Sequence, residues 1–314
     1  MYDFFLPDET ELSSVISETL NKSDNVKSIQ TIQTGWTNIT MDVEGELQNY
    51  IFRFPRNLFF AKMMIKDCIF CQFLRDKVSF LIPDMQLHLN NNRPFSMHKK
   101  IIGTSLLSQM DKLTASELDV IIDDLSLFLS QLHALPLNSI QDEIKESLSD
   151  FLDNLAVVHQ GDYDFNYHTP LRNIERSSLS LKIVHGDFHP GNILINEGCV
   201  NGIIDFAFAS ISDEHADLGR FLGRSSPRLG QALIDAYQHQ TKTVCDLQKV
   251  HDVADVFKYV EYKYVQYMQA FHPEIKIPLS VLQNSALEAD RLKKINDNLF
   301  NQQSLDRMSA SCIV

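Results

Sequence analysis

The chain has 314 residues, of which 44% are hydrophobic, and a formal net charge of −13. This length and composition suit one large domain or two with a sizeable core. They argue against a membrane protein, because no apolar stretch approaches the ~20 residues that a membrane helix needs, and the acidic balance argues against nucleic-acid binding. The N-terminus has early acidic residues and no basic segment of a signal peptide, so we expect a cytoplasmic protein with no membrane association.

The first hundred residues are predicted to be rich in strands. Three short runs separated by polar turns have strand-like patterns, at 29–32, 39–43 and 50–54. The turn between the first two contains Gly35, Thr37 and Asn38, whose backbone N–H groups and side chains could cover phosphates. Without other evidence, the same turn would be an ordinary hairpin.

A predicted helix over 59–78 follows, with apolar residues near i, i+4 spacing. It contains Cys68 and Cys71, a CxxC pair with no second pair in the chain, which we interpret as packing residues in a reducing compartment. Two further strands are predicted at 85–89 and 97–102, joined by the polar turn Asn90–Pro94. The remainder is mostly helical in pattern, with candidate helices at 116–135, 140–158, 227–240, 247–271 and 279–300.

The most informative segment is residues 184–206, which read VHGDFHPGNILINEGCVNGIIDF. The apolar run 181–184 predicts a buried strand, and the glycines and proline that follow place Asp187 and His189 on a loop. Strands at 193–195 and 200–206, joined by a turn at 196–198, then form a hairpin. A hairpin brings Asn192, at the start of one strand, close to Asp205, at the end of its partner.

Kinase-type phosphoryl transfer needs side chains of these types in this order. One carboxylate must meet the acceptor hydroxyl, and Asp187 is the candidate. An amide oxygen and a second carboxylate must hold Mg²⁺ over the phosphates, and Asn192 and Asp205 supply them. The alternative is that Asp and Asn serve only as turn formers in a loop rich in glycine and proline.

HGDFHPGNILI followed by GIIDF resembles the motif of the aminoglycoside phosphotransferase and choline kinase family, the small-molecule relatives of protein kinases. The resemblance extends downstream to Asp217-Leu218 and, with weaker motifs, upstream over most of the chain. It implies an α+β, bilobal, protein-kinase-like fold. Residues 1–102 would form a small antiparallel-sheet lobe that binds nucleotide, and residues 103–314 a larger helical lobe with the catalytic loop and the acceptor site.

The resemblance also implies roles for further residues. The turn at Gly35, Thr37 and Asn38 would be the nucleotide-covering loop. Arg53 stands where the family commonly has a lysine that pairs with phosphates, and Asp67 where it usually has a glutamate that pairs with this cation. The alternatives are a solvated charge on a strand and an exposed helix residue. His185 and Asp217 would hold the catalytic loop in shape, while His189 would either touch a phosphate or only pack.

The function implied is a small-molecule kinase that uses Mg²⁺ and either ATP or GTP. Acidity is concentrated after Lys100, with 29 acids and 17 bases, against 12 acids and 11 bases in residues 1–100. We therefore expect an aminoglycoside-like or other cationic hydroxyl compound as acceptor. Kinases for choline, homoserine, macrolides or methylthioribose, and a weakly active or non-catalytic nucleotide-binding protein, are the alternatives. A protein kinase is disfavoured, because HGD lacks the arginine of HRD and the short interval from Asp205 to Asp217 leaves no room for an activation segment.

Overall fold

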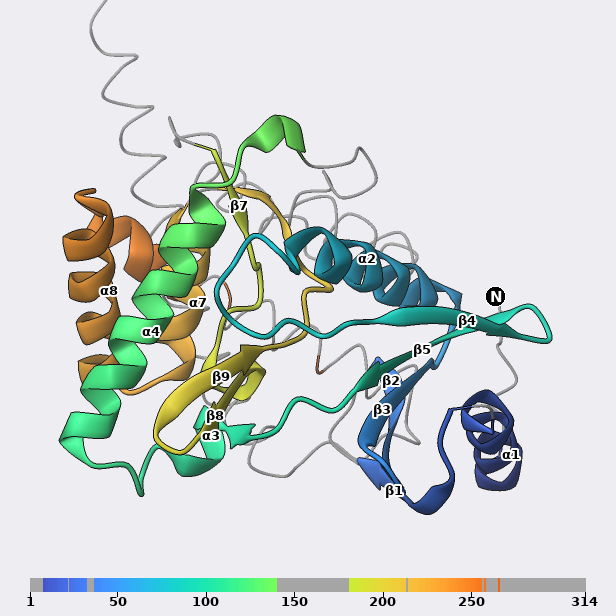
Figure 1. The fold of residues 1–314 in the computed structure, drawn as a ribbon. Helices are drawn as coiled ribbons and strands as arrows, with labels where there is room; N and C mark the ends of the chain where they lie inside the picture. The colour runs from blue at the N-terminus through green and yellow to red at the C-terminus, as the bar shows by residue number, and fades with distance from the viewer. Residues whose placement is uncertain are drawn as a thin grey trace, which may run out of the picture. The chain divides into compact units, whose positions relative to one another are not determined.

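The computed structural model describes residues 8–21, 23–32, 37–139, 181–212, 214–255, 257 and 265 (Figure 1). The chain divides into two compact units, Met1–Val253 and Ala254–Val314, and the architecture below belongs to the first. The helices predicted over 140–158 and 279–300 lie outside the described residues. Within the part that is described, no helix has the length and apolar character needed to cross a bilayer.

The amino-terminal part is an antiparallel sheet with the strand order β1-β2-β3-β5-β4. Its members are β1 (Val26–Ile32), β2 (Asn38–Gly45), β3 (Asn49–Pro55), β4 (Gln86–Asn90) and β5 (Arg93–Lys99). Alternate residues of β2 and β3, such as Val43 and Phe52, are buried in a small apolar core with Leu12 and Ile16 of helix α1 (Glu9–Leu20). This alternation is the strand pattern that the sequence predicts. Helix α1 was not predicted.

The turn between β4 and β5 is shorter than the predicted Asn90–Pro94. Asn91 and Asn92 have positive φ values of 49° and 62°, which are the values of a two-residue hairpin turn that asparagine tolerates. Pro94 therefore lies within β5, opposite Leu89 of β4, whereas pairing of β5 with β3 begins only at Ser96. The missing N–H of Pro94 thus costs no hydrogen bond to β3.

Helix α2 (Leu58–Leu74) follows β3 and ends four residues before the predicted Val78. The side chain of Asn57 caps it by accepting the N–H of Phe60. Its second half contributes Cys68, Phe70, Cys71 and Leu74 to the larger of the two apolar cores. Both cysteines are free and buried. Burial raises the pKa of the Cys68 thiol to about 12, which agrees with a packing role.

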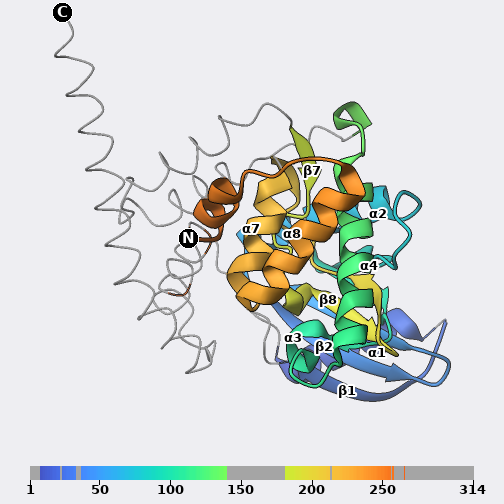
Figure 2. The ribbon, with the colours of Figure 1, turned by 90° about the vertical axis from the view of Figure 1, so that its left-hand side faces the viewer.

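The remaining described helices pack around this larger core. They are α3 (Leu106–Gln109), α4 (Ala115–His133), α7 (Glu214–Arg224) and α8 (Pro227–Thr241). Residues 247–255 are helical as well, at the start of the helix predicted over 247–271, most of whose remainder lies outside the described residues. Helix α4 begins with a capping box between Thr114 and Glu117 and buries the stripe that includes Ile121, Leu125 and Leu132. Helices α4, α7 and α8 lie side by side (Figures 1 and 2).

Short strands carry the motif segment. β7 (Lys182–Val184) pairs with the unpredicted β10 (Ser210–Ser212), and β8 (Ile193–Asn196) pairs with both β9 (Cys199–Ile203) and β6 (Thr104–Ser105). The predicted hairpin turn is present, with Glu197 and Gly198 at φ values of 51° and 80°. The predicted strand 200–206 is too long, because Asp205 adopts a left-handed φ of 68° and β9 ends before it.

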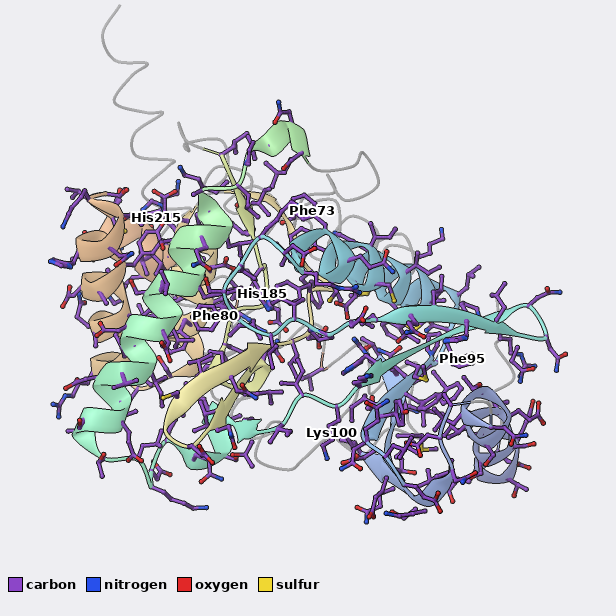
Figure 3. The ribbon with its side chains drawn as sticks, viewed as in Figure 1. Phe73, Phe80, Phe95, Lys100, His185 and His215 are labelled. Atoms are coloured by element: carbon purple, nitrogen blue, oxygen red, sulfur yellow. The ribbon has the colours of Figure 1, made fainter. Side chains whose placement is uncertain are left out.

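The fold class is therefore confirmed as α+β, with an antiparallel sheet before a mainly helical part. The larger core also receives Phe188 and Phe206, which directly follow Asp187 and Asp205 in sequence and are fully buried. His185 lies in this interior as well (Figure 3). These buried apolar side chains therefore fix the backbone next to each of the two acidic residues of the motif. The predicted lobe boundary near residue 102 stays a prediction.

Candidate active site

The predicted catalytic loop runs from the end of β7 to the start of β8. Its apolar member Phe188 is buried and stacks on Phe128 of α4, with ring centroids 5.7 Å apart. A 3₁₀ turn at Pro190–Asn192 closes the loop, capped by the ring of His189, whose Nδ1 accepts the N–H of Gly191 at 3.0 Å. The loop is therefore held by the packing of Phe188 in the core and by the hydrogen bond that His189 accepts within the loop.

Gly186 has a backbone conformation and surroundings that exclude other residues. Its φ is +77°, and an added Cβ would lie 2.1 Å from the carbonyl oxygen of Phe208. Phe208 follows Asp205 closely in sequence, so this contact joins the loop to the segment that carries the second acidic residue of the motif. Glycine is required here by the backbone and not only by the turn propensity noted in the sequence.

We expect Gly186→Ala to lower the free energy of unfolding by at least about 2 kcal/mol, because it adds backbone strain to a steric overlap. Gly198→Ala is the matched control: its φ is +80°, but its Cβ would meet only the flexible side chain of Glu117 at 3.3 Å. Chemical denaturation of both variants measures the difference. Equal losses of stability would show that the contact with Phe208 is unimportant.

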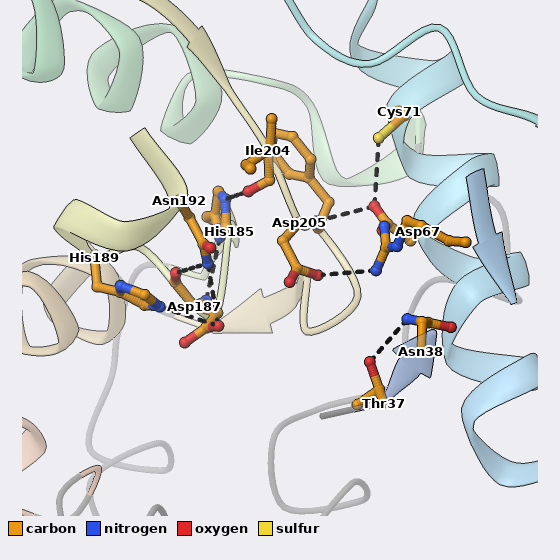
Figure 4. Close-up of polar contacts among 12 residues, drawn as sticks. Thr37, Asn38, Asp67, Cys71, His185, Asp187, His189, Asn192, Ile204 and Asp205 are labelled. Atoms are coloured by element: carbon orange, nitrogen blue, oxygen red, sulfur yellow. Dashed lines mark hydrogen bonds and ion pairs between the residues drawn. The ribbon is translucent and has the colours of Figure 1, made fainter. Parts of the chain in front are cut away.

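Asp187 is surrounded by hydrogen-bond donors. Its Oδ1 accepts a hydrogen bond from Nε of Arg220 at 2.7 Å and forms an ion pair with an Nη atom of the same side chain at 2.6 Å. Its Oδ2 accepts a hydrogen bond from Nδ2 of Asn192 at 3.2 Å and lies 3.5 Å from Nε2 of His189 (Figure 4). Burial of this carboxyl works to raise its pKa, but Arg220 and His189 outweigh burial, and the pKa of Asp187 lies well below its ordinary value. Asp187 is therefore a carboxylate at neutral pH.

The two candidate metal ligands are close to this carboxylate. Nδ2 of Asn192 also donates to the backbone oxygen of Asp187 at 3.0 Å, so its amide oxygen is directed away from Asp187. The backbone oxygen of Asn192 accepts the N–H of Ile204 at 3.0 Å, which connects Asn192 to the residue before Asp205. The hairpin thus brings Asn192 and Asp205 into one place, as the sequence predicts.

Asp205 is the most exposed of the acidic side chains here, at 39%. Its desolvation raises its pKa, Arg53 opposes this, and the carboxylates of Asp67 and Asp187 add to the increase. Solvent moderates the size of this shift because the side chain is partly exposed. A carboxylate held near two others is electrostatically unfavourable by itself, and a divalent cation would relieve the repulsion.

Arg53 and Asp67 form a largely buried ion pair, so they are neither a solvated charge on a strand nor an exposed helix residue. The Arg53 guanidinium binds Oδ2 of Asp67 and reaches Oδ1 of Asp205 at 3.6 Å. Asp67 is fully buried, and its Oδ1 also accepts the N–H of Phe206 at 3.0 Å and faces the thiol of Cys71 at 3.4 Å. The aspartate therefore reaches Arg53 although it is one methylene shorter than the glutamate of the family pattern.

Asp217 of α7 holds the backbone of the loop. Its Oδ2 accepts the N–H of His185 and its Oδ1 the N–H of Gly186, both at 2.9 Å. Nε2 of His133 contacts Oδ2 at 3.1 Å, and Nδ1 of the same ring lies 2.9 Å from the hydroxyl of Tyr237. A carboxylate only accepts, so Nε2 of His133 carries the proton and Nδ1 accepts from Tyr237.

His185 is fully buried, and burial lowers its pKa. Its Nε2 lies 3.2 Å from the carbonyl oxygen of Ile204, and its Nδ1 accepts the N–H of Asp187 at 3.2 Å. This pattern is that of a neutral ring that donates from Nε2 and accepts at Nδ1. The ring therefore links the backbone of the loop to the strand end that precedes Asp205.

The predicted nucleotide loop is described only in part. Gly35 lies outside the described residues. Asn38 is buried at the start of β2, and its Nδ2 donates to the hydroxyl of Thr37 at 2.8 Å. Its Oδ1 has no hydrogen-bond partner among the described residues. Nothing in these contacts links Thr37 or Asn38 to Asp187 or to Asp205.

Sequence reasoning missed three residues: Arg220, which contacts Asp187, His133, which contacts Asp217, and Tyr237, which contacts His133. The spacing of Arg220, three positions after Asp217, could have indicated that it lies near the site, because residues three apart share one face of a helix. His133 and Tyr237 lay inside helical patterns, where polar residues are ordinarily exposed. The packing of α8 against both α4 and α7 brings them close to Asp217.

The fold and the site define a kinase-like phosphotransferase. A family model described as the phosphotransferase enzyme family matches residues 28–248, well over half of the chain. The chain therefore belongs to the phosphotransferase enzyme family. This confirms the predicted family resemblance and the prediction that the chain is a phosphotransferase. A search of curated proteins finds no match to this chain.

Solved structures of the same fold include antibiotic phosphotransferases. The GDP and kanamycin complex of APH(2")-IIia has a TM-score of 0.68 and 18% identity, covering 91% of this chain and 99% of that one. The streptomycin-ATP-APH(2")-IIa ternary complex has a TM-score of 0.60 and 19% identity, covering 82% and 90%. The macrolide 2'-phosphotransferase MphH from Brachybacterium faecium has a TM-score of 0.61 and 11% identity, covering 88% and 97%. At these identities the similarity establishes the fold alone.

Proposed function

We propose that this protein is a small-molecule kinase that transfers the γ-phosphate of ATP or GTP to a hydroxyl group of an aminoglycoside-like or other cationic compound. The observation that carries the proposal is the Asp187 carboxylate, ionised and held beside Asn192, with Asp205 brought close by the hairpin. These are the acceptor-binding carboxylate and the two oxygen ligands that phosphoryl transfer needs.

On the acceptor side, Asp187 would accept a hydrogen bond from the hydroxyl and direct its oxygen at the γ-phosphorus. Its lowered pKa makes it a weak base. A loose, metaphosphate-like transition state tolerates this, because it needs orientation of the nucleophile more than early removal of the proton. The hydroxyl proton passes to Asp187 as the new oxygen–phosphorus bond forms and the bond to the leaving diphosphate breaks.

On the donor side, the residues present fit Mg²⁺. Asn192 and Asp205 offer hard oxygen donors, and the carboxylates near Asp205 favour a cation. When bound, Mg²⁺ neutralises charge on the phosphates. Arg53, fixed by buried Asp67 and close to Asp205, is oriented to contact the same phosphates. Gly35, Thr37 and Asn38 would cover them, in an amino-terminal lobe of residues 1–102.

The loop is kept in shape by two residues that would not touch substrate. Asp217 fixes the backbone N–H groups of His185 and Gly186. His185 connects the backbone of Asp187 to that of Ile204, so it joins the catalytic loop to the segment that precedes Asp205. These contacts support structural roles for both residues and no proton transfer by His185.

The charge of the chain and the solved structures of the same fold both support a cationic acceptor. Residues after Lys100 hold 29 acids and 17 bases, which would attract cationic ligands and repel nucleic acid. The kanamycin complex of APH(2")-IIia and the streptomycin complex of APH(2")-IIa have the same fold. The first contains GDP and the second ATP, so both donors are included in the proposal. We propose a cytoplasmic location without membrane association, as the sequence predicts.

The proposal is tested by supplying the purified protein with Mg²⁺, either ATP or GTP, and a panel of hydroxylated acceptors. The panel should contain kanamycin, streptomycin, a macrolide, choline and homoserine, with each acceptor analysed by mass spectrometry. We expect a phosphorylated product from at least one hydroxylated amine. Phosphorylation of none of them with either nucleotide would reject the proposal.

Asp205→Asn is expected to weaken Mg²⁺-dependent nucleotide binding at least tenfold while changing the free energy of unfolding by no more than about 0.5 kcal/mol. Asparagine tolerates the left-handed φ of 68° and removes a charge that is repelled by Asp67 and Asp187. Nucleotide binding is measured by calorimetry with and without Mg²⁺, and stability by thermal unfolding.

Asp42→Asn is the matched control, because Asp42 lies in a strand and pairs only with Lys100 at the surface among the described contacts. It should leave nucleotide binding unchanged. Unaltered Mg²⁺ dependence in Asp205→Asn would contradict the assignment of Asp205 as a metal ligand.

A further inference from the structure

Arg220 contacts the candidate catalytic carboxylate through two atoms. Its Nε lies 2.7 Å and an Nη atom 2.6 Å from Oδ1 of Asp187. The two side chains are 11% and 15% exposed, so solvent screens this pair weakly. Charge-assisted hydrogen bonds of this length are among the strong ones in proteins. The guanidinium therefore fixes both the position and the rotation of the carboxylate.

Two side chains on one face of helix α7 bind the loop. Asp217 and Arg220 are three positions apart, so their side chains are neighbours on the helix surface. Asp217 binds the backbone N–H groups of His185 and Gly186, and Arg220 binds the side chain of the next residue, Asp187. One turn of helix thus sets the main chain of the loop and the orientation of its catalytic group.

The two oxygens of Asp187 are not equivalent. Oδ1 receives both short contacts from Arg220. Among the described residues, Oδ2 has longer contacts, with Nδ2 of Asn192 at 3.2 Å and Nε2 of His189 at 3.5 Å. The 3.2 Å hydrogen bond from Asn192 is at the long end of the usual range, and the 3.5 Å contact with His189 is beyond it. Oδ2 is therefore the oxygen with capacity to accept another donor, such as a hydroxyl group.

We infer that Arg220 is a positioning residue for phosphoryl transfer: it holds Asp187 by Oδ1 so that Oδ2 is presented to the acceptor hydroxyl. The inference rests on the proposed function, because it gives Asp187 the role stated there. Arginine suits this task since it stays protonated throughout and its planar group resists rotation. Arg220 would act through Asp187 and would touch neither the nucleotide nor the acceptor.

The test compares Arg220→Met, Arg220→Lys and the control Arg75→Met. Arg75 also pairs with an aspartate, Asp84, but that pair is about half exposed. For each variant, kcat, the KM of the acceptor identified by the panel, the Kd of the Mg²⁺-nucleotide and the Tm are measured. We expect Arg220→Met to lower kcat on the order of 100-fold through misorientation of Asp187, with nucleotide Kd unchanged.

Lysine restores the positive charge but lacks the planar group that contacts Oδ1 through two atoms. The kcat of Arg220→Lys should therefore be about tenfold higher than that of Arg220→Met. Arg75→Met should match the wild type. If Arg220→Met does not fold, Arg220→Lys decides alone: a kcat about tenfold below wild type with unchanged nucleotide Kd supports the inference. A kcat within threefold of wild type in folded Arg220→Met, or a loss of nucleotide binding parallel to the loss of kcat, overturns it. No transfer by the wild type would overturn the proposed function itself, and this inference with it.

Discussion

Asp187→Ala is expected to reduce phosphoryl transfer by roughly 10²–10⁴-fold, the range that a positioned acid or base contributes. The carboxylate is the group held by Arg220, Asn192 and His189, and we place its Oδ2 against the acceptor hydroxyl. Nucleotide binding should persist, because Arg53 and Asp205 are linked to each other and not to the Asp187 side chain. Steady-state kinetics and calorimetric nucleotide binding measure the two effects separately.

Two further substitutions make this result specific. Asp187→Asn keeps the size of the side chain and removes its charge, so it should be as inactive as the alanine variant. Asp84→Ala removes an exposed carboxylate that pairs with Arg75 and should retain full activity. Transfer by Asp187→Ala at more than a tenth of the wild-type rate would mean that another group meets the acceptor.

Asp217→Ala should have the largest effect on stability, a loss of about 3–5 kcal/mol. The carboxylate is fully buried and satisfies two backbone N–H groups, of His185 and Gly186, as well as the ring of His133. Alanine leaves these donors buried without a partner, and each unsatisfied donor costs about 1–3 kcal/mol. Chemical denaturation of the purified variant measures the loss.

Asp235→Ala is the surface control for this measurement, since Asp235 lies exposed on α8 and bonds only to Gln231 among the described contacts. It should stay within about 0.5 kcal/mol of the wild type. A loss below about 1 kcal/mol in Asp217→Ala would mean that the loop backbone finds other partners, and that Asp217 does not hold the loop.

The parts of the site that could be predicted are those whose residues are close in sequence. Asp187, Asn192 and Asp205 lie within one loop and one hairpin, and the turn at Glu197-Gly198 has the left-handed conformation that glycine favours. A hairpin fixes which residues oppose each other, so the closeness of Asn192 to the strand before Asp205 follows from the pattern alone. The structure has this arrangement.

Contacts between distant segments were harder to predict. The pair Arg53–Asp67 joins a strand to a helix, and its position was implied only by the family resemblance. The pair Arg220–Asp187 spans 33 positions, and nothing in the pattern of α7 indicates which residue Arg220 meets. Such contacts depend on how helices pack, which periodicity alone does not determine.

Among the elements that were not predicted, helix α1 and strand β10 were missed for different reasons. Helix α1 has readable signals, with Asp8 capping the N–H of Glu11 and an apolar stripe of Leu12, Ile16 and Leu20. The acidic residues of this segment were interpreted only as evidence on targeting. Strand β10, Ser210–Ser212, is short and mostly serine, so it has no strand pattern and exists because β7 pairs with it.

The most direct test of the central claim is ³¹P NMR of one reaction mixture. It contains Mg²⁺, ATP or GTP, the acceptor of the panel and either wild type or Asp187→Ala. For the wild type we predict a phosphomonoester signal that grows as the γ-phosphate signal of the nucleotide falls, and for Asp187→Ala no such signal. Inorganic phosphate as the sole product, released at the same rate by both proteins, would contradict the account.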